Sequence, residues 1–275
     1  MYETNFHKAA TAQDAAALLA KSEDGKILAG GQTLIPTMKQ RLAAPMDLVD
    51  LSCVAALRGV AIAKRKKMGI MKAHGGETIT IGAMTTHAEV AADEELKKIC
   101  PVICGLAGNI GDPAVRHRGT IGGSVANNDP AADYPAALLA LDATIHTDRR
   151  EITAADYFKG MFLTALNDDE IIVAVSFEAP ALGGYGKFPN PASRYAMAGV
   201  FVAKSVRGEV RVVVTGAGKN GVYRHADLEA ALSVDWSAAA VDGVTVSADG
   251  LMSDLHGNAT YRANLIKVMA KRALA

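Results

Sequence analysis

The chain has 275 residues, half of them hydrophobic but only 5% aromatic, and its 29 Lys and Arg balance its 29 Asp and Glu. This length fits one large domain or two to three small ones, and the lack of a basic surplus argues against nucleic acid or an anionic membrane as a partner. No apolar run reaches the roughly 18 residues of a membrane span. Because the N-terminus also lacks a signal-peptide pattern, we expect a cytoplasmic protein without a transmembrane segment.

Cysteine and histidine usage argues against a metal centre on this chain. The three thiols, Cys53, Cys100 and Cys104, are fewer than the four that an iron–sulfur cluster normally needs. Cys100 and Cys104 stand four residues apart, which is compatible with one helix face but is more typical of small buried side chains. The seven His residues show no metal-binding spacing.

The first elements predict a compact α/β unit. Thr11, followed by Asp14 three residues later, is a typical N-cap and predicts a helix over residues 11–25. The stretch "KILAGG" predicts a short strand that runs into a pair of glycines, and a second helix and a second strand follow over residues 33–45 and 46–52.

The next part begins with a polar interruption, residues 63–77, whose basic run Lys64–Lys67 is compatible with an exposed hairpin or with a docking patch. A strand over 78–84 and a helix opened by a capping box of Thr86 and Glu89 come next. The pattern then predicts a buried helix, a helix followed by a strand, and a capped turn, at residues 100–110, 135–148 and 151–158.

From about Ala179 the composition changes. Residues 180–193 are rich in Gly and Pro and predict a boundary or a mobile connection. Two strands joined by the turn "RGE" follow over 195–206 and 209–218, and helices complete the chain. Strands followed by helices predict a separate α+β lobe.

Two glycine-rich segments share one chemical character: "LAGGQTLIP" (28–36) and "GTIGGSVANNDP" (119–130). Paired glycines allow the backbone to approach a ligand with successive N–H groups pointing into one concavity, and the adjacent hydroxyl residues add donors. Neither segment fits the Rossmann fingerprint or the P-loop. Because paired glycines are also common in ordinary turns, the residues alone leave a dinucleotide or phosphate site and a structural role both open.

The segments "AGGQTL" and "TIGGSVANNDPAADYP" resemble the flavin signatures of the medium subunit of molybdenum-containing hydroxylases, the family of aerobic carbon monoxide dehydrogenase and xanthine dehydrogenase. The resemblance extends over "TIGAMTTHAEV", "KFPNPASRYAMAGV" and "YRANL". It implies an α+β, FAD-binding fold of the vanillyl-alcohol-oxidase (PCMH) type. Two N-terminal α+β subdomains, residues 1–55 and 56–178, would be followed by a C-terminal α+β domain of three antiparallel strands and helices, residues 179–275.

The resemblance also implies a set of FAD contacts. The pyrophosphate would be wrapped by the first loop, which comprises Leu28, Ala29, Gly30, Gly31, Gln32, Thr33 and Leu34. Its other side would be covered by Thr120, Gly123 and Ser124, with Asn127 nearby. Asp133 would accept from a ribose or ribitol hydroxyl, unless it is only a helix N-cap.

Further contacts are implied around the flavin ring. Ile172 would pack near it, and Lys187 would approach it unless its stem merely packs on the surface. Tyr185 and Tyr195 are either ring contacts or core tyrosines. Gln32 cannot form a covalent flavin bond, so the FAD should be non-covalent.

By the same resemblance, the chain is an electron-transfer subunit with no catalytic acid or base of its own. A large molybdenum-pterin subunit and a small [2Fe–2S] subunit would join it in a dimer of heterotrimers, in the cytoplasm or at the periphery of the inner membrane. Electrons would leave FAD for a quinone, NAD or oxygen. The alternatives are a stand-alone flavin oxidoreductase, for which His117 is a conceivable base, and a flavin-free assembly subunit.

Overall fold

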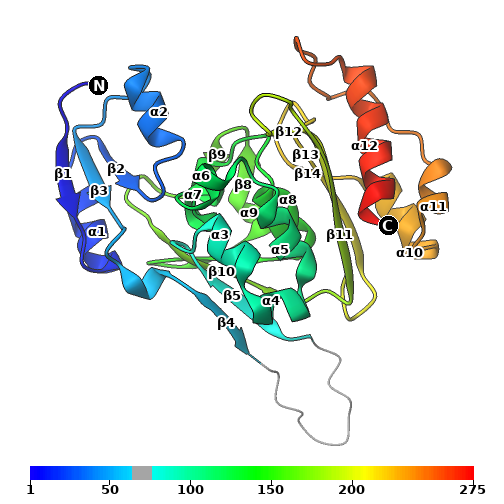
Figure 1. The fold of residues 1–275 in the computed structure, drawn as a ribbon, viewed down its shortest axis with the longest axis horizontal. Coiled ribbons are helices and arrows are strands. Elements are labelled where there is room, and N and C mark those ends of the chain that lie inside the picture. Colours follow the sequence, from blue (N-terminus) through cyan, green and yellow to red (C-terminus); the bar gives the residue numbers. More distant parts are fainter. Residues whose placement is uncertain (64–75) are drawn as a thin grey trace, which may run out of the picture.

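The computed structural model describes residues 1–63 and 76–275. Its three main β-sheets follow one another along the long axis in chain order, from the N-terminal sheet to the C-terminal sheet and the helices outside it (Figure 1). A two-stranded hairpin, β8 (Phe158–Gly160) and β9 (Leu163–Thr164), lies beside the central sheet. The predicted basic hairpin at Lys64–Lys67 lies outside the described residues.

The N-terminal sheet is small and parallel. Its strands lie in the order β1 (Asn5–Lys8), β3 (Asp47–Asp50) and β2 (Gly25–Leu28). They are connected through α1 (Ala12–Leu19) and α2 (Leu34–Lys39). The Thr11 hydroxyl accepts from Asp14 N at 3.0 Å, and the Asp14 carboxylate accepts from Ala10 N at 2.9 Å, so α1 begins at the predicted cap.

The central sheet has five antiparallel strands. Their order is β4 (Val60–Ala63), β5 (Thr78–Gly82), β10 (Ile172–Glu178), β6 (Thr144–Thr147) and β7 (Glu151–Thr153), with the short η1 (Ala55–Leu57) before β4. Along the chain, the helices between β5 and β6 are α3 (His87–Ala92), α4 (Glu94–Ile99), α5 (Pro101–Gly108), α6 (Pro113–Arg116), α7 (Ile121–Asn127) and α8 (Tyr134–Ala140), and α9 (Ala154–Tyr157) follows β7. The predicted capping box of Thr86 and Glu89 is present at α3.

These helices and strands enclose the largest hydrophobic core, which is built mainly from aliphatic side chains and Ala. Cys100 and Cys104 are both buried in it, as expected for small apolar side chains. They do not share one helix, because α4 ends at Ile99 and Pro101 begins α5. None of the helices in the described ranges is long and apolar enough to cross a membrane.

The C-terminal sheet contains the three expected antiparallel strands, β11 (Leu182–Pro189), β12 (Ala196–Lys204) and β13 (Val210–Thr215), and a two-residue β14 (Tyr223–Arg224). α10 (Ala226–Val234), α11 (Ala238–Asp242) and α12 (Ala259–Ala273) follow, and α12 packs on β11 and β12 (Figure 1). The prediction of a mobile connection over 180–193 is wrong for most of its length, because β11 pairs with β12 along that whole strand.

The glycines that suggested a connection have a packing role in β11. A Cβ on Gly184 would lie 1.6 Å from the Ala273 carbonyl oxygen, and one on Gly186 would lie 2.2 Å from that of Met269. Since side chains alternate along a strand, these glycines allow α12 to lie against one face while Tyr185 and Lys187 project to the other. On that other face of the sheet, α5 contacts β11, and α8 contacts β12 and β13.

Replacement of Gly184 by Ala should therefore destabilise the chain. Overpacking of this kind costs about 1–3 kcal/mol, because the α12 backbone must move away from β11. Chemical denaturation of Gly184→Ala measures the loss. Gly105→Ala is the control: a Cβ there meets nothing within 4 Å, so a helical Ala should leave stability unchanged or raise it by about 0.5–1 kcal/mol. Equal stability of the Gly184→Ala variant and the wild type would contradict the close-packing argument.

Candidate functional site

The first glycine loop, residues 28–34, runs from the last residue of β2 to the first residue of α2. Gly31 adopts a φ of +70°, which favours glycine. Among the described residues, no hydrogen-bond acceptor is found for the backbone N–H groups of residues 30–34. Five consecutive unpaired donors on one short loop form a site that suits a multiply charged anion such as a pyrophosphate.

The second glycine loop, residues 119–124, differs from the first because most of its backbone donors are already used. Gly122 N donates to Ala83 O at 2.9 Å, and Gly123 N donates to the Thr120 hydroxyl at 3.1 Å. Ser124 N donates to Thr120 O at 3.0 Å. This loop therefore offers hydroxyl groups to a ligand, and its glycines serve close packing instead.

The two loops are in direct contact. A Cβ on Gly30 would lie 2.1 Å from the Arg118 carbonyl oxygen, so only glycine allows the first loop to approach the second this closely. A Cβ on Gly123 would lie 3.5 Å from the Ala29 Cβ. The predicted pair of loops is thus brought together in space, although about 90 residues separate them in the chain.

Asp133 is buried and is bound on both carboxylate oxygens. Tyr185 donates its hydroxyl to Oδ1, and Lys187 Nζ lies 2.8 Å from Oδ2. Asp133 precedes α8, but its side chain makes no capping hydrogen bond, so the N-cap alternative does not hold. Burial raises the pKa of Asp133, and the Lys187 charge opposes that shift.

Lys187 is not a surface lysine with a packed stem. Its side chain is 8% exposed, and Nζ donates to Asn109 O at 3.2 Å in addition to the Asp133 contact. Asn109 follows α5, so Lys187 joins β11 to both α5 and α8. Two residues predicted for one site are therefore paired with each other.

The segment that carries Asp133 is also held from the C-terminal sheet. Thr215, at the end of β13, is fully buried, and its hydroxyl lies 3.1 Å from Pro130 O and 2.7 Å from Ala132 O. Gly216 N donates to Pro130 O at 2.8 Å. The C-terminal sheet thus fixes the backbone of residues 130–133.

Tyr195 brings the first loop into the same region. Desolvation and the Asp129 carboxylate raise the pKa of its phenol, and the nearby Thr33 side chain opposes that rise. The residue is 44% exposed, so the core-tyrosine alternative does not describe it. Thr33, Asp129 and Tyr195 therefore form the edge of the site between the first loop and the C-terminal sheet.

The remaining predicted residues lie at the margins of this region. Ile172 begins β10 and is buried in the main core, and α7 packs against β10. Asn127 is partly exposed at the end of α7. Its neighbour Asn128 adopts a left-handed conformation and donates through Nδ2 to Gly160 O and Leu163 O, both at 2.8 Å. The "NN" pair before Asp-Pro was the available signal for this turn, since Asn tolerates positive φ.

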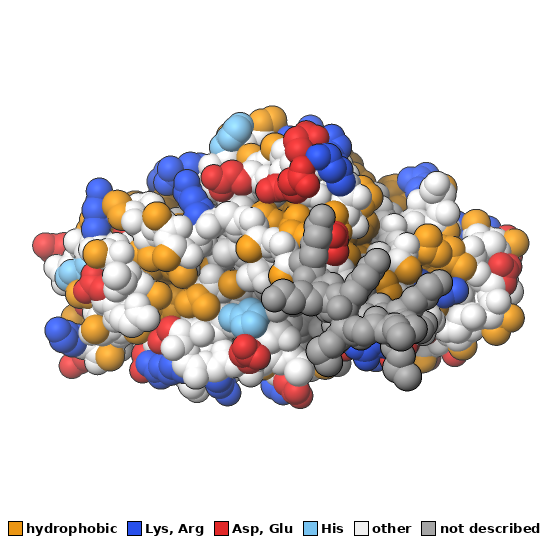
Figure 2. Space-filling view, turned by 90° about the horizontal axis from the view of Figure 1, so that it is seen from below, with side chains coloured by type: hydrophobic (Ala, Val, Ile, Leu, Met, Phe, Trp, Pro, Cys, Tyr) orange, Lys and Arg blue, Asp and Glu red, His pale blue; other side chains and the backbone are white. Residues whose placement is uncertain are grey.

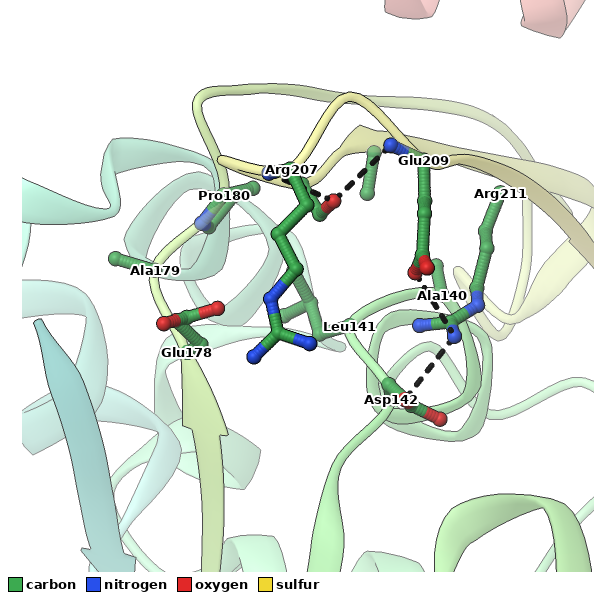
Figure 3. A pocket seen from close by; sticks show the side chains of 11 residues that line it. Ala140, Leu141, Asp142, Glu178, Ala179, Pro180, Arg207, Glu209 and Arg211 are labelled. Atoms are coloured by element: carbon green, nitrogen blue, oxygen red, sulfur yellow. Dashed lines mark hydrogen bonds and ion pairs between the residues drawn. The ribbon is translucent and has the colours of Figure 1, made fainter. Parts of the chain in front are cut away.

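A hollow of about 140 Å³ lies elsewhere, where Glu178–Pro180 at the end of β10 meet the β12–β13 turn (Figure 3). Its Arg211 is 3.0 Å from Asp142 and 3.6 Å from Glu209. None of its lining residues belongs to the glycine loops.

On the face drawn in Figure 2, positive and negative side chains are interspersed, as the balanced charge suggests.

Behind the second loop lie His87 and Tyr134. Their ring centroids are 5.5 Å apart, and His87 Nδ1 and the Tyr134 hydroxyl are buried without a partner in the described chain. Burial and the Arg116 charge lower the pKa of His87 to about 4. A Cβ on Gly119 would lie 2.7 Å from His87 Nε2, so the imidazole directly supports this loop in its neutral form.

The chain matches the family described as the FAD binding domain in molybdopterin dehydrogenase over residues 2–180. That match covers both glycine loops and Asp133. The chain belongs to this family.

Full-length relatives extend the assignment. The chain is 35% identical to the nicotine 6-hydroxylase medium subunit of Paenarthrobacter nicotinovorans, over 96% of this chain and 94% of the relative. It is 30% identical to the carbon monoxide dehydrogenase medium chain of Hydrogenophaga pseudoflava, over 98% and 95%. Reconstituted carbon monoxide dehydrogenase from Oligotropha carboxidovorans matches with a TM-score of 0.86 at 30% identity, over 99% of this chain and 96% of that one. The predicted family, fold class and oxidoreductase class are confirmed.

His87 makes stability depend on pH in a defined window. Its pKa is about 6.5 when unfolded and about 4 when folded, so the unfolded chain binds the extra proton and stability falls as the pH drops from 6.5 to 4. The loss should reach about 3 kcal/mol. Denaturant titrations across this range should show it in the wild type and not in His87→Gln. His117 is exposed, so the control variant His117→Gln should lose stability over this pH range as the wild type does. Parallel stability curves for the wild type and His87→Gln would show that His87 does not cause the loss.

Proposed function

We propose that this chain is the FAD-binding electron-transfer subunit of a three-subunit molybdenum hydroxylase. The observation that carries the proposal is the run of five unpaired backbone donors at residues 30–34, held in contact with the second loop. A pyrophosphate supplies the charged oxygens that such a loop requires. Membership of a family of FAD-binding domains supports the choice of FAD.

Each side of the region would contact a different part of the dinucleotide. The N–H groups of the first loop would bind the pyrophosphate, with Leu28 and Leu34 at the ends of the loop. The hydroxyls of Thr120 and Ser124 would add donors from the second loop, with Asn127 nearby. Gln32 offers no nucleophile for a covalent bond, so we infer that the FAD is held non-covalently.

Asp133 and Lys187 would meet the ribitol and the ring. Asp133 keeps unused lone pairs after accepting from Tyr185 and Lys187, so a ligand hydroxyl can join the same carboxylate. Lys187 would place a cation near the ring, where it stabilises negative charge on the reduced flavin. Ile172 would contribute an aliphatic contact from β10.

When bound, FAD accepts electrons singly and releases them in pairs, which suits a junction between one-electron carriers and an external acceptor. The electrons would come from the [2Fe–2S] clusters of a small partner subunit, and the oxidation of substrate would take place on a large molybdenum-pterin subunit. No group of three or more potential metal-binding side chains occurs in the described ranges of this chain. We propose a dimer of such heterotrimers in the cytoplasm.

The three segments predicted from the sequence remain part of this proposal. Residues 1–55, 56–178 and 179–275 each contain one of the three main sheets. The first two would hold the FAD between them. The third would complete the site through Tyr185, Lys187 and Tyr195.

Flavin retention tests the first loop. Gly31→Val should lower FAD affinity tenfold or more, roughly the loss of one or two hydrogen bonds to a charged group. Val strongly disfavours the positive φ of this position, so the backbone would change conformation and its N–H groups would no longer point to the ligand. Gly250→Val is a matched control, since Gly250 has a φ of +73° and open space around it. The measurement is FAD content by absorbance together with thermal stability. Equal flavin content in the Gly31→Val and Gly250→Val variants would show that the first loop does not bind FAD.

The mode of attachment gives a second test. We expect the purified chain to show flavin absorbance and to release intact FAD into the supernatant after acid precipitation, because no residue of the first loop can link to the ring. Flavin that remains in the pellet would contradict non-covalent binding. A colourless chain that takes up no added FAD, alone or with its partner subunits, would support a flavin-free assembly role. Flavin reduction by a substrate without partners would support a stand-alone enzyme.

A further inference from the structure

Tyr185 has a position that the FAD contacts alone do not explain. It projects from the same face of β11 as Lys187, and its hydroxyl donates to Asp133 rather than facing outward. The paired strand makes room for it: a Cβ on Gly199 of β12 would lie 2.6 Å from the Tyr185 hydroxyl. A glycine is thus needed opposite Lys187 so that the Tyr185 hydroxyl can reach the carboxylate.

The carboxylate of Asp133 is shared between two donors from one strand. Tyr185 binds Oδ1 and Lys187 binds Oδ2, so the phenol fixes the plane of the carboxylate and leaves one defined edge for the ammonium group. Lys187 is the only cation that pairs with Asp133 in the described chain. The net charge of the Asp133–Lys187 pair therefore depends on whether Asp133 is ionised, and the hydrogen bond from Tyr185 favours the ionised form.

We propose that Tyr185 is a positioning residue that acts through Asp133 to set the net charge of the Asp133–Lys187 pair beside the flavin. The inference rests on the proposed function, because it assumes FAD beside Lys187. Tyr185 itself needs no contact with the ring.

The groups around Asp133 give the expected direction. Besides Tyr185 and Lys187 of β11, the titratable side chains that face this region are Tyr134 of α8, Tyr195 after β11, Asp129 before α8 and Cys104 of α5. With Asp133 ionised, the Asp133–Lys187 pair has no net charge. Once Asp133 takes up a proton, the pair carries one positive charge, which favours reduction of a nearby flavin.

Removal of the Tyr185 hydroxyl takes one hydrogen bond from the ionised carboxylate and makes protonation easier. The midpoint potential of the bound flavin, which rises on acidification because reduction itself takes up protons, should show an additional step where Asp133 takes up its proton. In Tyr185→Phe this step should move to higher pH by about one to two units, because the lost hydrogen bond was made to a charged group. Dye-linked redox titrations of the FAD-loaded chain at a series of pH values measure it.

Three variants separate positioning from structure. Tyr157→Phe also removes a buried hydroxyl, one that donates to Val125 O at 3.3 Å, and should leave the curve unchanged. Asp133→Asn should lack the step, and Tyr185→Phe added to Asp133→Asn should change nothing further. A Tyr185 that acts only through packing would shift the curve on both backgrounds, and this outcome would overturn the inference.

Flavin content, measured first, separates a failure of the proposed function from a failure of the role of Tyr185. Wild-type chain and complex that bind no FAD would overturn both the proposed function and the role of Tyr185. A flavin-loaded chain whose wild-type and Tyr185→Phe curves coincide would overturn only the positioning role. A shift that Tyr185→Phe causes in the wild type but not in Asp133→Asn would support the positioning role.

Discussion

The site depends on one buried polar junction, in which β11 of the C-terminal sheet meets Asp133 before α8. Burying a carboxylate and an ammonium group costs several kcal/mol for each ion, and that cost is offset only when both are paired and hydrogen-bonded. Here Tyr185, Asn109 O and the ion pair supply those bonds. Loss of any one partner would leave a buried charge poorly compensated, so the C-terminal sheet and the central unit are held in one relative position.

The same junction explains the composition of β11. A strand that must lie against a helix backbone on one face and present polar groups to a buried carboxylate on the other needs small and large residues in alternation. Gly184 and Gly186 serve the first requirement, and Tyr185 and Lys187 serve the second. The Thr215 hydroxyl of β13 lies within hydrogen-bonding distance of the carbonyls of Pro130 and Ala132 and so fixes the backbone that carries Asp133. The strands β11 and β13 therefore position the same segment.

This dual use also shows what the sequence alone can predict. Helix caps such as Thr11 and Thr86 depend on neighbouring residues, so local patterns identify them correctly. The glycines of β11 pack against α12, which lies about 80 residues later in the chain. No local sequence pattern distinguishes this packing role from a loop. The resemblance placed Asp133 and Lys187 at one ligand, but their mutual ion pair arises from tertiary contact, as does the hydroxyl of Tyr185 on the same carboxylate.

The two glycine loops look alike in sequence but divide the work between them. The second loop uses its N–H groups to bind Ala83 O and the oxygens of Thr120, which makes it a rigid surface, and His87 supports it from behind. The first loop is pressed against that surface at Gly30 and keeps its own donors unpaired. Preorganised donors cost little further ordering when an anion arrives. The second loop thus serves as the surface on which the first loop packs, and the first loop keeps its N–H groups for a ligand.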